Sequence, residues 1–173
     1  MKNIIFIGTL HAGLTPFGEL QETLEYYKPE QLLVEISQSD IENNNLKTCP
    51  DEMRFALLWA IKNSIPVFGF DVSFSVLVKG KTEKDNLLVI KEQKKVMERY
   101  SWKEANTSRV SKDLNIPQLR VLVDQKKESE REQKMLENIR NVMFSNKRIV
   151  VLTGVGHLHF FEQYFPDALF PFR

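Results

Sequence analysis

Four side chains that can carry a proton or bind a metal ion each lie at or just after the end of a short apolar run. His11 comes three residues after Gly8, and His157 ends the segment GVGH. Glu35 lies in the run LLVEI, and Asp71 follows the run PVFGF. Imidazole and carboxylate groups are ligands for Zn²⁺, Mn²⁺, Co²⁺ or Fe²⁺. Without a metal, an imidazole oriented by a carboxylate is a general base near pH 7. Both routes lead to hydrolysis by an activated water, and the spacing does not choose between them.

The apolar runs have the pattern of buried strands. Each is short and continuous, as in strands covered on both faces, and the runs are Asn3–Ile7, Gln31–Ile36, Pro66–Phe70 and Arg148–Thr153. Segments with helical periodicity lie between them, which predicts an α/β fold with a central, mostly parallel sheet flanked by helices. The carboxyl ends of parallel strands line one edge of a sheet, where ligands bind. We therefore expect the four reactive side chains to converge.

The second half of the chain has a different character. Residues 72–147 are interpreted as a mostly helical segment within a single domain that spans residues 1–173, and basic residues outnumber acidic ones over most of it. We expect helices broken near Tyr100-Ser101 and at Asn115-Ile116-Pro117, with the last helix running from Gln118 to about Ser145. The charged stretch is interpreted as a solvated helical face, and a basic surface for an acidic partner is the weaker alternative.

Arg131 in the last of these helices has two alternative interpretations. It lies one turn before Met135, so it could face the interior while Glu128 and Glu130 stay in water. A buried guanidinium needs a carboxylate partner, such as Glu35 or Asp71. The other interpretation is an exposed ladder of charged pairs. Periodicity alone favours the exposed ladder.

Composition excludes several classes of protein. A length of 173 residues fits one domain, and a net charge of +1 gives no electrostatic reason to expect a nucleic-acid partner. The single Cys49 excludes an internal disulfide framework, and no apolar run is long enough to cross a membrane. We expect a soluble cytoplasmic protein that acts on a small molecule or a peptide. The sequence does not indicate the oligomeric state.

The ordered motifs resemble the TraB/PrgY/Tiki family of the wider erythromycin-esterase-like and ChaN-like group. The segments that carry the resemblance are GTLH near the start, the acidic residue of LLVEI, SEREQKMLENI, and GVGH after the last expected strand. His11, Glu35, Arg131 with Glu132, and His157 occupy the family's motif positions. The order agrees from residue 4 to about residue 160. The chain is short for this group, and residues 72–115 have no counterpart that we can place.

The resemblance implies an EreA/ChaN-like α/β fold with a site built from the two motif histidines, the acidic residue and the helix arginine. Tiki members are similar to metal-dependent peptidases that favour Mn²⁺ or Co²⁺, whereas erythromycin esterases open a lactone with a His-activated water. ChaN-like members bind haem, and TraB/PrgY members restrain peptide pheromone signalling. The resemblance therefore indicates a site more firmly than a reaction.

Two hypotheses of function follow. The first is a hydrolase in which a water, activated by a metal or by histidine, attacks an ester or peptide carbonyl, and Arg131 stabilises the oxyanion or anchors the substrate. The second is a non-catalytic regulatory protein that binds a peptide, haem or a metal in the same pocket. The candidate catalytic residues are His11, Glu35, Arg131 and His157, with Asp71 and Glu132 as additional candidates. The candidate metal ligands are His11, Glu35 and His157, for Mn²⁺, Co²⁺, Zn²⁺ or Fe²⁺.

Overall fold

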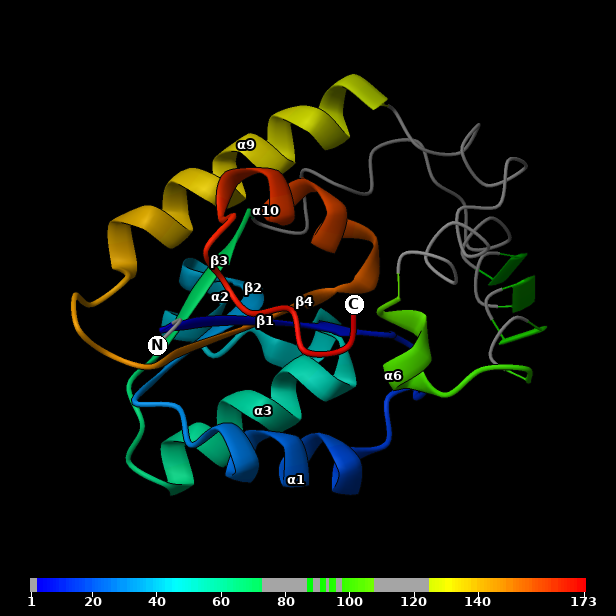
Figure 1. The fold of residues 1–173 in the computed structure, drawn as a ribbon, viewed down its shortest axis with the longest axis horizontal. Helices are drawn as coiled ribbons and strands as arrows, with labels where there is room; N and C mark the ends of the chain where they lie inside the picture. Colours follow the sequence, from blue (N-terminus) through cyan, green and yellow to red (C-terminus); the bar gives the residue numbers. More distant parts are fainter. Residues whose placement is uncertain (1–2, 73–86, 89–90, 93, 96–97, 108–124) are drawn as a thin grey trace.

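A four-stranded parallel sheet forms the centre of the computed structural model, which describes residues 3–72, 87–88, 91–92, 94–95, 98–107 and 125–173. The strands are β1 (Ile4–Thr9), β2 (Gln31–Ser37), β3 (Val67–Asp71) and β4 (Ile149–Gly154). Their order across the sheet is β1-β4-β2-β3, and every pair is parallel (Figure 1). The predicted α/β fold with a parallel sheet is confirmed, and each strand lies within one or two residues of its expected bounds.

Helices cover both faces of this sheet. In Figure 1, α1 (Phe17–Tyr27) and α3 (Asp51–Lys62) lie on one side, while α9 (Gln125–Val142) and α10 (Leu158–Tyr164) lie on the other. The two-sided cover explains the continuous apolar runs, because all seven residues of β2 and all six of β4 are buried. Within the described part of the chain, no helix is long and apolar enough to cross a membrane.

Short elements connect these layers. They are α2 (Gln38–Glu42), η1 (Leu46–Thr48), α6 (Trp102–Ala105) and η2 (Val155–His157). Ser101 caps α6 by accepting a hydrogen bond from the backbone N–H of Glu104, which confirms the break expected near Tyr100-Ser101. The expected break at Asn115–Pro117, and residues 118–124 of the expected long helix, lie outside the described residues.

A threonine just before α1 ties the preceding loop together. Pro16 occupies the N-cap position of the helix, directly after Thr15. The Thr15 hydroxyl donates to the carbonyl of Leu10 at 2.8 Å and accepts from the Leu10 N–H at 2.7 Å. Thr15 therefore closes the loop that carries His11. The chain reverses within this loop through two residues with positive φ, Ala12 and Gly13.

The last strand lies in the middle of the sheet. β4 pairs with β1 on one side, with Thr9 opposite Gly154, and with β2 on the other. The residues that follow β4 therefore emerge between the end of β1, which leads to His11, and the end of β2, which carries Glu35. This topology places the histidines and the acidic residue together although they are far apart in sequence.

An asparagine side chain fixes the end of β1. The Asn106 amide accepts a hydrogen bond from the Gly8 N–H at 2.7 Å and donates to the Gly8 carbonyl at 3.0 Å. Glycine is needed here because a Cβ on Gly8 would lie 2.7 Å from both Asn106 Oδ1 and Leu158 Cδ1, and 3.0 Å from the Val155 backbone. The strand that leads to His11 is thus packed against groups with no room for a methyl group.

We therefore predict that Gly8→Ala lowers the free energy of unfolding by about 1–3 kcal/mol, the usual range for overpacking. The matched control is Gly18→Ala in α1, where an added Cβ meets no atom within 4 Å and a helical alanine is favoured. Urea denaturation followed by circular dichroism measures both variants. Equal stability of Gly8→Ala and wild type would contradict the close packing described for β1.

Candidate functional site

The predicted site residues surround the backbone of Gly154, at the end of the central strand. A Cβ built on Gly154 would lie 3.5 Å from His11 Nε2, 3.6 Å from Glu35 Oε2 and 3.7 Å from His157 Cδ2. Two histidines and a carboxylate therefore share one place at the carboxyl edge of the sheet, as the sequence predicts. Asp71 and Glu132 join the same group of side chains through Arg131 and His157.

Arg131 lies inside this group, and its side chain is only 13% exposed. Its Nε and Nη2 donate to the two oxygens of Asp71 at 2.9 and 2.8 Å, and Nη2 also donates to Glu35 Oε1 at 2.8 Å. Its Nη1 contacts Glu128 Oε1 at 3.1 Å and His157 Nε2 at 3.3 Å. The interpretation favoured by periodicity, an exposed charge ladder, is therefore wrong for Arg131. Glu128, its partner on the same helix, is 30% exposed.

These contacts also limit what Arg131 can do. A guanidinium has five N–H groups, and five contacts to neighbouring side chains engage all of them. The expected role of Arg131 as an oxyanion donor or substrate anchor needs a free N–H, which this arrangement does not offer. Burial lowers the pKa of Arg131, but Asp71 and Glu35 outweigh this effect and raise it, so the guanidinium remains charged. Arg131 is a positioning residue.

Glu35 is held from both sides as a carboxylate. Its Oε1 accepts from Arg131, while its Oε2 accepts from the Thr153 hydroxyl and from the Gly154 N–H, both at 2.6 Å. Burial raises the pKa of Glu35, but the positive charges of His157 and Arg131 outweigh it and lower the pKa to about 2. Glu35 thus has the partner that its position in an apolar strand requires.

His157 is fixed by the helix that faces it. Its Nδ1 lies 2.8 Å from Glu132 Oε1, while its Nε2 contacts Arg131. Burial lowers the pKa of His157, but Glu35 and Glu132 outweigh it and raise the pKa overall. Arg131 can only donate, so its contact requires an Nε2 without a proton. Protonation of His157 would turn Nε2 from an acceptor into a donor and break this contact.

His11 forms a separate pair with Glu52, a residue that the sequence analysis missed. His11 Nδ1 lies 2.6 Å from Glu52 Oε1, and the imidazole is 43% exposed whereas the carboxylate is 1% exposed. Burial lowers the pKa of His11, but its hydrogen bond and charge interaction with Glu52 raise it overall. Among the described residues, Glu52 Oε2 has no hydrogen-bond partner. Burying a carboxylate costs free energy, and the contact with the His11 imidazole offsets part of this cost.

Asp71 contacts both the neighbouring backbone and Arg131. One of its oxygens accepts from the Val72 N–H at 2.7 Å, and both accept from Arg131. Burial and the negative charge of Glu35 raise the pKa of Asp71, while the Arg131 hydrogen bonds lower it, with a net rise. Asp71 thus reaches the site only through the guanidinium.

The most closely spaced metal-binding atoms in the described residues are not those of the ligand set predicted from the sequence. Among the described residues, one group has ligand atoms that all lie within 4.8 Å of one another, and it consists of Glu128, Glu132 and His157. The trio predicted from the sequence, His11, Glu35 and His157, does not meet this spacing. Whether a metal binds at either set stays a prediction.

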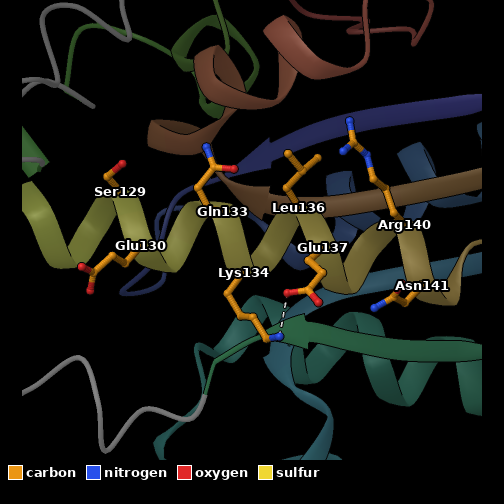
Figure 2. Close-up of a pocket in the computed structure, with 8 residues that line it drawn as sticks. All are labelled: Ser129, Glu130, Gln133, Lys134, Leu136, Glu137, Arg140 and Asn141. Carbon is orange, nitrogen blue, oxygen red and sulfur yellow. Dashed lines mark hydrogen bonds and ion pairs between the residues drawn. The ribbon is translucent and has the colours of Figure 1, made fainter.

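A depression of the described surface lies elsewhere. It has a volume of about 630 Å³ and follows the outer face of α9 from Ser129 to Asn141, and no predicted site residue lines it. An ion pair 2.7 Å long joins Lys134 and Glu137 on this part of α9 (Figure 2). The opposite face of the same helix carries Arg131 and Glu132 into the candidate site.

Comparisons with family models, curated proteins and solved structures find no match to this chain, so the resemblance to the TraB/PrgY/Tiki family stays a prediction from the motifs. The description of the site therefore depends on its own geometry.

The depressed pKa of Glu35 predicts acid sensitivity of the fold. The ionised carboxylate stabilises the folded state above pH 4.5, its ordinary pKa, and this contribution is lost as the pH falls toward 2. We predict that Glu35→Gln is less stable than wild type at pH 7 and that the difference shrinks between pH 4.5 and pH 2. Urea denaturation over this range measures it. Glu22→Gln, on an exposed turn of α1, is the control and should match wild type throughout. A constant difference between Glu35→Gln and wild type would contradict the prediction.

Proposed function

We propose that this protein is a hydrolase in which His11 acts as a general base and activates a water for attack on an ester or amide carbonyl. The observation that carries the proposal is the pairing of an accessible imidazole with a buried carboxylate, His11 with Glu52. A donor–acceptor distance of 2.6 Å from Nδ1 holds the tautomer in which Nε2 has the free lone pair. Among the described residues, Nε2 makes no hydrogen bond, so it is available to a water.

The place for this water is beside Gly154. The missing side chain leaves space next to His11 Nε2, and the Gly154 N–H is oriented by its hydrogen bond to Glu35. Arg131 in turn donates a hydrogen bond to Glu35, and two further hydrogen bonds from Arg131 to Asp71 fix the position of the guanidinium. The buried ion pairs thus support the position of the glycine backbone beside the water. Such rigid support matters because a small displacement of a general base removes much of the rate acceleration that it provides.

The proposed reaction follows from these positions. His11 Nε2 accepts a proton from the water as the oxygen adds to the carbonyl carbon, and the resulting imidazolium is stabilised by Glu52. The protonated His11 then donates this proton to the leaving alcohol or amine as the carbon–heteroatom bond breaks. Water is consumed, and a carboxylic acid and an alcohol or amine are released.

A metal-assisted route with His11 as a ligand fits the geometry less well. A metal bound to His11 Nε2 would use the lone pair that the general base needs, because Nδ1 faces Glu52. Glu35, the second expected ligand, already accepts three hydrogen bonds. These contacts favour the alternative in which His11 activates the water without a metal.

The raised pKa of His11 gives the proposal a pH signature. A general base works only when it is deprotonated, so activity should rise with pH and reach half its plateau above pH 6.5, the ordinary histidine value. Glu52→Gln removes the charge that raises this pKa, so the midpoint should fall and the rate should drop about 10²–10⁴-fold, as expected for a disabled base. The pH dependence of kcat/KM for an ester that the wild type hydrolyses measures both effects. The hydrolase proposal fails if His11→Ala keeps full activity.

Gly154→Ala tests the water position independently of any charge. A methyl group here would be in ordinary van der Waals contact with His11, Glu35 and His157, so the fold should tolerate it while the space for a water is lost. We expect at least a tenfold loss of kcat with an unchanged melting temperature. The control is Gly156→Ala, two residues later, where an added Cβ meets nothing within 4 Å. Equal activities of the two alanine variants would place the reacting water elsewhere.

A panel of activated esters, lactones and dipeptides supplies the substrates for these measurements. Saturable binding of a panel member without any product would instead favour the second hypothesis, a non-catalytic binding protein that uses the same pocket.

A further inference from the structure

The side chains around Arg131 carry more negative charge than their own cations neutralise. The connected carboxylates are Glu35, Asp71, Glu128 and Glu132, and the only cationic side chains in contact with them in the described site are Arg131 and His157. Even with His157 protonated, four negative charges face two positive ones. Glu35 and Asp71 are buried, so solvent does little to screen the excess. Among the described residues, this group therefore carries two more negative charges than positive ones.

The excess negative charge lies beside a closely spaced set of metal-binding atoms. Glu128 and Glu132 project from successive turns of α9, and His157 faces both of them from η2. His157 Nε2 lies 3.6 Å from Glu128 Oε1, and one ligand atom of each of the three residues can be chosen so that all lie within 4.8 Å of one another. Metal–ligand bonds of about 2.1 Å place neighbouring ligand atoms roughly 3 to 3.5 Å apart, so a bound cation would draw these side chains closer together.

We propose that Glu128, Glu132 and His157 bind one divalent cation of the Mn²⁺ or Zn²⁺ class. One imidazole and two carboxylates are a ligand set that suits these ions, and the remaining coordination positions would be open to water or a ligand. The site differs from the trio predicted from the sequence because it uses neither His11 nor Glu35. The inference goes beyond the proposed hydrolysis and does not depend on it.

Arg131 does not prevent this binding. Its Nε and Nη2 contacts to Asp71 and Glu35 are 2.8 to 2.9 Å long, whereas its Nη1 contacts to Glu128 and His157 are the two longest, at 3.1 and 3.3 Å. The guanidinium is therefore anchored from the side away from the proposed ligands. A cation would replace the weaker Nη1 contacts, while the anchoring pairs keep the arginine in place.

Calorimetric titration of the whole chain with Mn²⁺ and with Zn²⁺ tests the proposal without any substrate. We expect one ion per chain for wild type and at least a tenfold weaker affinity for Glu128→Gln and for Glu132→Gln. Glu130→Gln is the matched control, because Glu130 lies on the same helix between the two ligands but points to solvent, and its affinity should be unchanged. His11→Ala should also bind normally.

Three outcomes would overturn the proposal. The first is that neither ion binds to wild type, and the second is that Glu130→Gln loses as much affinity as the two ligand variants. The third is that His11→Ala loses affinity while Glu128→Gln binds normally. This third result would move the ion to the trio predicted from the sequence. If a variant fails to fold, nuclear magnetic resonance of the wild type still tests the site, because this measurement needs no substitution. Zn²⁺ should shift the ring signals of His157 and leave those of the exposed His159 in place. Failure of the hydrolase proposal leaves each of these results unaffected.

Discussion

The buried guanidinium of Arg131 is the charge on which the arrangement of the site depends. Without it, Glu35 and Asp71 would be two unpaired carboxylates at the edge of a sheet that is covered on both faces. With it, they become a connected set that fixes the end of β2, the end of β3 and the facing turn of α9. The same set orients the Gly154 backbone through Glu35, so the position of a neutral glycine depends on an ion pair.

The two histidines have different surroundings and should do different work. His11 is half exposed and depends on one buried carboxylate, which suits a group that gains and loses a proton during a reaction. His157 is buried between Arg131 and Glu132, where a change of protonation disrupts a contact that stabilises the site. Division of labour between a reactive and a supporting histidine is therefore consistent with the geometry, although both follow a glycine-containing turn after a strand.

The fold and most of the site were predictable from the sequence, because continuous apolar runs reveal strands buried on both faces and the ends of parallel strands meet at one edge. The orientation of Arg131 was not, because α9 has so many charged residues at this point that helical periodicity does not separate its two faces. Glu52 was missed for another reason. An acidic residue in the first turn of a helix is expected from the helix dipole alone, so nothing in the sequence marked it as the partner of His11.

The central place of β4 has a consequence for the order in which the protein assembles. β1 and β2 flank a strand that begins only at Ile149, so during synthesis both have an unpaired edge until β4 has been made. Exposed apolar strand edges favour pairing with other chains, and pairing over such a long sequence separation is slow. The nascent protein is therefore most vulnerable to aggregation before β4 emerges from the ribosome. The strand that completes the sheet also completes the site, because Gly154 and His157 follow directly from it.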